Sequence, residues 1–270
     1  MENQSNIEYP RVVLGLDVST SCIGISIVED YGDNKTPVIT AITHKQPRIP
    51  KKISGIESLC LKKFSFNEGF LRNISEYTDK RITDVVIEEP LLSSNNINTV
   101  ATLLRFNGMI ADACYTTLGI VPNFISSHDA RMFSFPELNT LRKYNKKGEE
   151  YDIKTITNAI KKNNLVLFGS YPFDVDKKGI MMNMVNDLYV NENAVPWDYN
   201  SKHELKKENY DACDALVCAL AYININRYGI DKPVISKYEL QEREYDYLIN
   251  YTVKIWNKEF DKKLIINKKI

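Results

Sequence analysis

Four acidic residues occur where the surrounding sequence predicts a packed core rather than a solvated surface. They are Asp17, Glu88, Asp211 and Asp214. The first follows an apolar run at residues 12–16, the second follows residues 85–87, and the last two lie within segment 208–228. A carboxylate is costly to bury unless a positive charge meets it. Carboxylate oxygens are also the ligands that hard divalent cations prefer.

Asp17 taken alone allows two interpretations. Residues 12–16 predict a buried strand, residues 18–22 a tight turn of small polar residues, and residues 23–28 the returning strand of a hairpin. Asp17 can cap backbone N–H groups of that turn, or it can bind a metal ion or a cation carried by phosphate. The hairpin by itself favours neither interpretation.

The segment 208–228 predicts a helix in which Asp211 and Asp214 share one face, because residues three apart are neighbours on a helix. Alanine and cysteine surround them, which indicates tight packing. Two acids on a packed face repel each other unless they share a cation. If this helix docks beside the strand ends, four carboxylates converge. Two ions about 4 Å apart can then activate water and stabilise the leaving oxygen of a phosphodiester.

Glu88 and Glu89 end the same predicted strand, and Pro90 follows them. Side chains alternate between the two faces of a strand, so these two glutamates point in opposite directions. The β-branched residues that precede Glu88 select it as the inward acid. Glu89 is expected to point away.

The remaining pattern predicts an α/β protein with a mixed sheet. Apolar patterning favours further strands at 38–43, 84–88 and 120–125, and helices at 64–81 and 96–118. Residues 126–135 are expected to be a connector. Gly108 is expected to allow close packing of its helix on the sheet.

The net charge does not indicate a nucleic-acid partner, since the formal net charge of the 270 residues is zero. Two local stretches are basic. Residues 45–63 include Lys51 and Lys52, and read either as a solvated loop or as a loop that follows phosphates. Residues 136–207 include Lys146 and Lys147, and are interpreted as an inserted subdomain. Within it, residues 142–162 are lysine-rich, and we expect residues 45–63 and 142–162 to flank one groove.

The five cysteines form no C-x-x-C pair, which predicts reduced core thiols and a cytosolic setting. The first ten residues lack the apolar core of a signal peptide. No apolar run approaches the roughly 20 residues of a membrane span. The Lys-, Asn-, Ile- and Tyr-rich composition is typical of AT-rich genomes, including viral ones, for which the compartment would be the host cytoplasm.

Three motifs together resemble RuvC-like Holliday-junction resolvases of the ribonuclease H-like superfamily. They are residues 14–19 (LGLDVS) with Gly24, residues 86–88 (VIE), and residues 211–216 (DACDAL). The resemblance implies a ribonuclease H-like fold, a mixed five-stranded sheet flanked by helices. We predict this nuclease domain at 11–230, interrupted by the insertion at 136–207 and followed by a helical extension at 231–270.

The resemblance also implies an activity. The family acts as homodimers on four-way DNA junctions and makes paired nicks in DNA recombination. By carry-over, Asp17, Glu88, Asp211 and Asp214 would bind two Mg²⁺ ions per site, with Mn²⁺ able to substitute. Arg131 is the candidate for the family's basic residue after the fifth strand.

Other functions remain open. A related nuclease acting on other branched DNA or on RNA·DNA hybrids would use the same carboxylates. An actin-like or sugar-kinase-like phosphotransferase begins with a similar acidic turn, but it needs a second copy of the fold and a glycine-rich adenosine motif. A DNA-binding scaffold with an inactive nuclease fold would not need all four acids.

Overall fold

The computed structural model describes residues 10–32, 35–50, 52–90, 96–134, 181–182, 185–186 and 197–228. The chain divides into two units, Met1–Ser134 with Asn191–Gly229, and Phe135–Val190 with Ile230–Ile270. In the second unit the structure describes only residues 181–182 and 185–186. The sheet and the candidate site both lie in the first unit.

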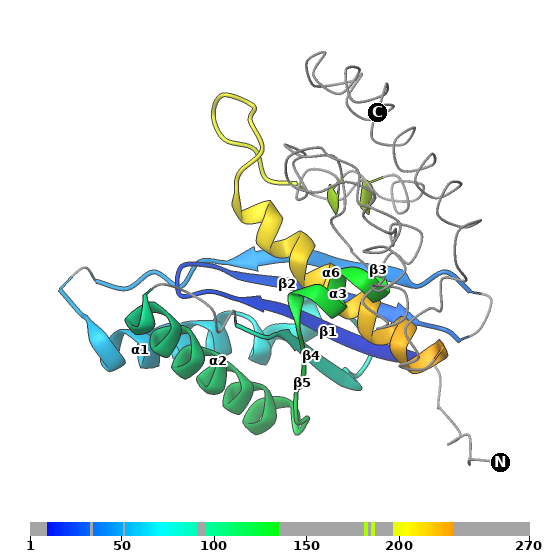
Figure 1. Ribbon diagram of the computed structural model, residues 1–270, viewed down its shortest axis with the longest axis horizontal. Helices are drawn as coiled ribbons and strands as arrows, with labels where there is room; N and C mark the ends of the chain where they lie inside the picture. Colours follow the sequence, from blue (N-terminus) through cyan, green and yellow to red (C-terminus); the bar gives the residue numbers. More distant parts are fainter. Residues whose placement is uncertain are drawn as a thin grey trace, which may run out of the picture. The chain divides into compact units, whose positions relative to one another are not determined.

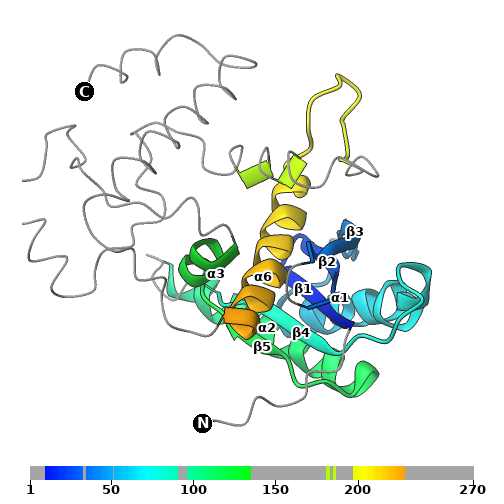
Figure 2. The ribbon, with the colours of Figure 1, turned by 90° about the vertical axis from the view of Figure 1, so that its right-hand side faces the viewer.

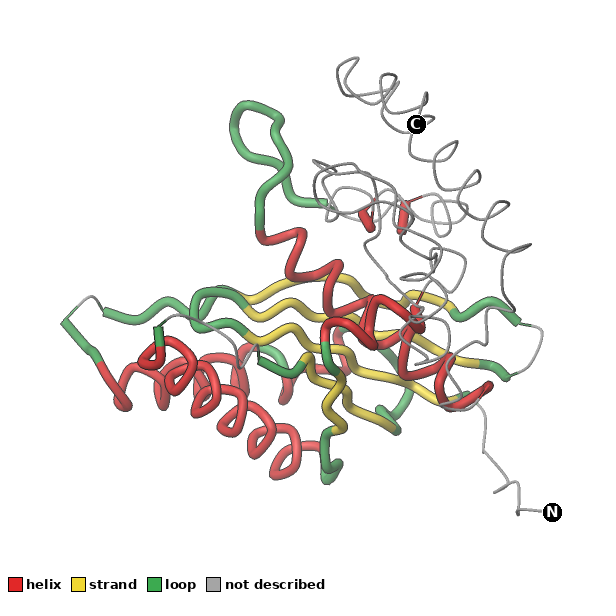
Figure 3. The backbone as a smooth tube through the Cα atoms, viewed as in Figure 1, coloured by secondary structure: helices red, strands yellow, loops and turns green. Residues whose placement is uncertain are grey.

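The first unit is built on a five-stranded mixed sheet, drawn in yellow in Figure 3. The strands are β1 (Arg11–Val18), β2 (Ile23–Asp30), β3 (Val38–Lys45), β4 (Asp84–Glu88) and β5 (Asn123–Ile125), in the order β3-β2-β1-β4-β5. The β1–β2 and β2–β3 pairs are antiparallel, whereas the β1–β4 and β4–β5 pairs are parallel. The predicted mixed five-stranded sheet is therefore confirmed.

Helices cover both faces of the sheet (Figures 1 and 2). One face carries α1 (Gly55–Gly69) and α2 (Ile97–Leu118), and the other carries α6 (Glu208–Tyr228) with α3 (Ser127–Ser134) packed against it. None of the helices in the described ranges is long and apolar enough to cross a bilayer.

Strand alternation decides which residues face α6. On β1, residues Val12, Leu14 and Leu16 belong to the apolar core together with residues of α1 and α2. Successive side chains of a strand point to opposite faces, so Gly15 and Asp17 face α6. The same alternation leaves the even-numbered residues of β2 and of β4 on the α6 side of the sheet.

Two predicted boundaries around the basic stretch are wrong. The loop predicted across residues 45–63 is helical from Gly55 onward, and the helix predicted at 64–81 is α1, which already ends at Gly69. A short 3-10 helix, Leu71–Glu76, follows. The buried residues Leu59 and Phe66 lie two helical turns apart, but the lysines between them conceal that spacing in the sequence.

Three further predictions need correction. Residues 126–135 do not form a plain connector, because Ser127–Ser134 is the helix α3. The strand β5 spans only Asn123–Ile125 of the predicted 120–125. Gly108 does not face the sheet: a Cβ atom added there would meet nothing within 4 Å.

The predicted insertion and tail lie largely outside the described residues. Among these, the 136–207 stretch contributes 181–182, 185–186 and 197–207, and the last of these leads into α6 within the first unit. The domain boundaries at 136–207 and 231–270 stay predictions.

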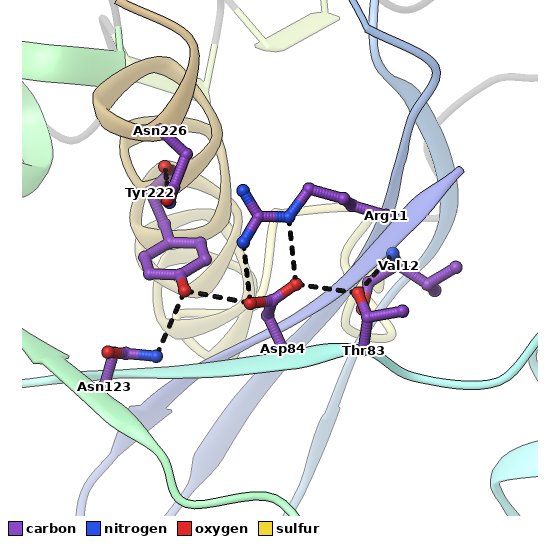
Figure 4. Close-up of polar contacts among 7 residues, drawn as sticks. All are labelled: Arg11, Val12, Thr83, Asp84, Asn123, Tyr222 and Asn226. Atoms are coloured by element: carbon purple, nitrogen blue, oxygen red, sulfur yellow. Dashed lines mark hydrogen bonds and ion pairs between the residues drawn. The ribbon is translucent and has the colours of Figure 1, made fainter. Parts of the chain in front are cut away.

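A polar network fixes the C-terminal end of α6 to the starts of β1 and β4 (Figure 4). Arg11 donates two hydrogen bonds to the Asp84 carboxylate, from Nη2 at 2.9 Å and from Nε at 3.2 Å. The Tyr222 hydroxyl donates to Asp84 Oδ1 at 2.9 Å, and Thr83 Oγ1 donates to Oδ2 at 2.7 Å. The guanidinium of Arg11 also lies 5.6 Å from the centre of the Tyr222 ring.

A second contact fixes the same end of α6 to β2. Arg227 forms an ion pair with Asp30, and their side chains are only 5% and 1% exposed. The Asp30 Oδ1 atom accepts hydrogen bonds from Arg227 Nε at 3.0 Å and from the Gly32 backbone N–H at 2.9 Å. Buried charges of this kind are tolerated when they are paired and hydrogen-bonded. Both contacts set the direction of α6 across the sheet.

We expect Asp84→Asn to lower the free energy of unfolding by about 2–3 kcal/mol at pH 7, since hydrogen bonds to charged groups contribute about that much. Burial opposes ionisation of Asp84, but its hydrogen bonds to Arg11, Thr83 and Tyr222 outweigh burial and lower its pKa. A lowered folded-state pKa adds stability that is fully present above the unfolded value of about 3.9 and is lost as the pH falls through the folded value.

The difference between wild type and Asp84→Asn should therefore shrink below pH 4, as measured by urea unfolding. Asp79→Asn is the matched control, because Asp79 is exposed and should show no such dependence. A difference that stays constant between pH 7 and pH 3 would contradict this account.

Candidate metal centre

Three of the four predicted carboxylates converge. One oxygen atom from each of Asp17, Glu88 and Asp214 lies within 4.8 Å of the others, and all three residues are half-buried. The register of the parallel strands pairs Leu16 with Ile87, so the next residue of each strand lies at the same edge of the sheet. Alternation then turns both acids toward α6.

Two glycines allow α6 to bring Asp214 close enough. A Cβ atom at Gly24 would overlap the backbone of Asp211, and one at Gly15 would overlap the carbonyl oxygen of Ala215. Glycine is required where one backbone approaches another this closely. The prediction that small residues pack this helix tightly is confirmed, since Ala215 and Ala219 are fully buried.

The turn that follows Asp17 is held from several sides. Ser19 closes it locally, because its Oγ donates to the Cys22 carbonyl at 2.8 Å and accepts from the Cys22 N–H at 3.0 Å. From α1, Lys62 Nζ donates to the Thr20 carbonyl at 2.6 Å. The turn predicted at residues 18–22 is thus present, and it restrains the chain directly after Asp17.

A buried residue of α2 contacts the same end of β1. The Nδ2 atom of Asn107 lies 3.4 Å from the Val18 carbonyl oxygen and 3.0 Å from that of Leu103. Asn107 is 3% exposed, so its amide contributes to the packed wall behind the carboxylates.

Asp211 is not part of the three-carboxylate group. It lies one helical turn before Asp214, beside the buried thiol of Cys22. Burial raises the pKa of Cys22, and the hydrogen bond to Asp211 raises it further. The structure therefore assembles Asp17, Glu88 and Asp214, and places Asp211 at the margin of the site.

The buried thiol of Cys218 is influenced by the charges of the three carboxylates. Burial raises the pKa of this thiol well above its ordinary value, and the charges of Glu88, Asp17 and Asp214 raise it further. Arg131 on α3 acts in the opposite sense on the same thiol. Arg131 lies on α3, a helix that sequence patterning missed and that packs against α6.

The donor set fits a hard divalent cation. The group contains only carboxylates, which suit Mg²⁺ and Mn²⁺ rather than metals that prefer thiolate or imidazole. The neighbouring thiols of Cys22 and Cys218 stay protonated because burial raises their pKa. Glu88 rather than the exposed Glu89 belongs to the group, as alternation predicted.

The predicted DNA-binding residues have different outcomes. Lys52 is exposed in the turn before α1, and Arg131 lies on α3. Lys51, Lys146 and Lys147 lie outside the described residues.

Much of the basic stretch 45–63 is already engaged within the protein. Lys63 Nζ pairs with Asp112 at 2.5 Å, and Lys45 lies 5.7 Å from the centre of the Tyr77 ring. Lys62 holds the turn after Asp17. The positive charge of these lysines is evident from the sequence, but their partners within the protein are not.

Comparison with known proteins returns structures but no sequence match: no protein-family model and no curated protein matches the chain. Thermus thermophilus RuvC in complex with a Holliday junction substrate matches with 12% identity and a TM-score of 0.47, over 83% of this chain and 99% of its own. The yeast mitochondrial Holliday junction resolvase Ydc2 matches with 10% identity and a TM-score of 0.44, over 92% and 86%. Fowlpox virus resolvase matches with 12% identity and a TM-score of 0.29, over 78% and 96%.

Each of these three structures is named either as RuvC or as a resolvase. The fold itself is defined by the strand order and the strand directions given above.

We expect Gly24→Ala to displace α6 from the sheet, because the new Cβ atom would overlap the Asp211 backbone. Overpacking of this kind should cost about 3 kcal/mol or more, since the obstacle is backbone rather than a flexible side chain. The variant should also lose stabilisation by Mn²⁺, measured as the rise in melting temperature on adding the ion.

Gly69→Ala is the matched control, because a Cβ atom at Gly69 would meet nothing within 4 Å. It should leave both quantities nearly unchanged. Wild-type stability and Mn²⁺ response in Gly24→Ala would show that close packing of α6 does not build the site.

Proposed function

We propose that this protein is a metal-dependent endonuclease that resolves four-way DNA junctions by paired nicks. The observation that carries the proposal is the convergence of Asp17, Glu88 and Asp214 at one edge of a ribonuclease H-like sheet. The order and spacing of the three sequence motifs support a junction substrate rather than a kinase substrate. A nuclease acting on forks or on RNA·DNA hybrids would use the same carboxylates.

The carboxylates would hold two Mg²⁺ ions, with Mn²⁺ able to substitute. Bound at such a site, the ions activate a water molecule and stabilise the leaving oxygen of the phosphodiester. Asp17 and Glu88 provide oxygens from rigid strand ends, and Asp214 provides one from α6. Asp211 is the proposed fourth ligand, and it lies one turn from Asp214 on the same helix.

Positive groups close to this edge would hold the DNA backbone. Arg131 on α3, which packs against α6, would bind a phosphate, because guanidinium groups bind phosphate oxygens in pairs. Lys52 would contact a phosphate farther along the strand. Lys51, Lys146 and Lys147 complete the proposed set, in stretches that the structure does not describe. Such local contacts can bind DNA even though the chain has no net charge.

The assembly would be a homodimer, since one site makes one cut and resolution of a junction needs two. The exposed face of α2 supports this proposal. Gly108 lies in the middle of that helix, where glycine costs about 1 kcal/mol relative to alanine, and no atom of the described chain approaches its Cβ position. Close approach of a second copy would account for it.

The charges on this face are complementary to themselves. If two α2 helices cross antiparallel at Gly108, Arg105 of one copy would lie opposite Asp112 of the other, and each pairing would occur twice. Asp112 would then bind Arg105 of the second copy in addition to Lys63 of its own chain, which lies 2.5 Å away. Leu104, which is 45% exposed, would be covered at the same crossing. A surface that matches itself in this way is what a two-fold interface requires.

The catalytic proposal predicts that Asp17→Asn and Asp214→Asn abolish nicking of a four-way junction while binding of the junction stays measurable. The reason is that each variant removes one anionic ligand without removing any DNA-binding cation. Cleavage is measured on a four-way junction, a fork, a linear duplex and an RNA·DNA hybrid, with Mg²⁺, with Mn²⁺ and with a chelator.

Glu89→Gln serves as the neighbouring control and should cleave like wild type, because Glu89 is exposed outside the carboxylate group. Full activity in Asp214→Asn would refute the site. Preferential cleavage of forks or of hybrids by wild type would redirect the substrate assignment.

The dimer proposal predicts that Arg105→Glu shifts the protein toward monomer in sedimentation velocity, because like charges then face each other at the crossing. Combining it with Asp112→Arg should restore the dimer. A wild-type protein that stays monomeric at tens of micromolar, with and without junction DNA, would overturn the proposal.

A further inference from the structure

A short hairpin precedes α6 and projects beyond its first turn in both views (Figures 1 and 2). We call residues 198–207 the entry hairpin. Tyr199 and Leu205 form an antiparallel bridge, which places their side chains next to each other across the hairpin. Tyr199 is 52% exposed and Leu205 is 43% exposed. The hairpin thus presents an aromatic ring and an aliphatic side chain together to solvent.

The entry hairpin is closed by several hydrogen bonds within its own residues. The Asn200 carbonyl accepts from the His203 N–H at 3.0 Å, and the Asn200 N–H donates to the Glu204 carbonyl at 2.9 Å. The Asn200 side chain bonds Glu204 as well, through Nδ2 to Oε2 at 2.8 Å. His203 adopts a left-handed φ of 60°, which closes the turn tightly. The exposed ring of Tyr199 is therefore held on an ordered scaffold.

One buried residue ties this scaffold to the helix of the metal centre. Asn209, which is 2% exposed, donates to the Asp198 carbonyl at 2.7 Å and accepts from the Asp198 N–H at 2.9 Å. Asn209 lies five residues before Asp214 on α6, which at 1.5 Å per residue is about 8 Å along the axis. The hairpin and the carboxylates thus have a fixed spacing.

The charges of the entry hairpin leave cations available. Its two acids have partners: Asp198 pairs with Lys206 at 3.7 Å and lies 3.7 Å from His44 Nε2, and Glu204 is bound by Asn200. Lys202 and Lys207 are exposed, and among the described residues neither has an ion pair. Exposed lysines beside an aromatic platform are the composition that binds unpaired nucleic acid.

We propose that the entry hairpin is a DNA-contacting surface in which Tyr199 stacks on a base exposed at the branch point while Lys202 and Lys207 bind the flanking phosphates. The inference rests on the proposed junction-cleaving function and deepens it. In a continuous duplex every base face is covered by its neighbours, whereas at a branch point a face becomes available. Stacking on Tyr199 would therefore favour branched DNA over linear duplex.

The test measures DNA binding in the Asp214→Asn background, where DNA is not cut. Adding Tyr199→Ala should weaken binding of a four-way junction by about 5- to 100-fold, the range expected for loss of one stacked base, and should leave linear duplex unchanged. A fluorescent adenine analogue at the branch point should be quenched by the parent protein and not by this variant. Tyr199→Phe should retain both properties.

The lysines should act differently from the ring. Lys202→Ala and Lys207→Ala should weaken junction and duplex alike, and each should reduce the slope of log affinity against log salt by about one. Phe64→Ala is the matched aromatic control, because Phe64 is 61% exposed on α1 at the opposite face of the sheet. It should leave the ratio of junction to duplex affinity unchanged.

Equal binding by the parent and Tyr199→Ala, with equal quenching, would overturn the hairpin assignment while leaving the nuclease proposal intact. A parent that binds junction no better than duplex would instead count against the junction proposal. The hairpin is then judged on single-stranded DNA: the assignment stands if Tyr199→Ala weakens that binding and fails if it does not.

Discussion

The candidate site depends on how closely α6 approaches the β1–β2 pair. Gly15 and Gly24 remove the side chains that would hold the helix away, so the backbone of Asp211 occupies the space of a missing Cβ atom. The three carboxylates repel one another, so nothing in the acids themselves draws them together before a cation binds. Packing between helix and sheet must supply that attraction. The two glycines are therefore as much a part of the site as the three carboxylates.

Contacts at the C-terminal end of α6 hold the helix in place, although its N-terminal half brings mutually repelling carboxylates together. Asp84 binds Arg11 and Tyr222, and Asp30 binds Arg227, so both polar contacts join α6 to strands. In each contact a carboxylate of the sheet accepts hydrogen bonds from an arginine guanidinium, and in the first contact also from a tyrosine hydroxyl. These contacts fix the direction of the helix, and they lie far enough along it to leave the carboxylate end open. The contacts that stabilise α6 therefore lie at its C-terminal end, and the carboxylate of the candidate site lies in its N-terminal half.

Sequence patterning predicted the convergence of three carboxylates better than it predicted the elements around them. Asp17 and Glu88 follow from period-two alternation at the ends of apolar runs, and Asp214 follows from helical spacing among small residues. The separation of Asp211 from the group depends on the rotation of α6 about its axis, which spacing alone does not determine. The helix α3 escaped detection because eight residues provide too few turns for a periodic signal. Arg131 was chosen from the family resemblance, by its position after the fifth strand, and its role stays a prediction.

The lysines of this neutral chain differ in whether they are bound within the protein or exposed to solvent. Lys62 and Lys63 are engaged by Thr20 and Asp112, so their charges serve the fold rather than a ligand. Lys202 and Lys207 stand on the entry hairpin, whose distance from Asp214 is fixed by α6. Under the proposed function, the positions of these cations matter more for recognition than the sum of charges, because a cation held at a set distance from Asp214 favours one geometry of the bound DNA. A uniformly basic surface would bind every geometry.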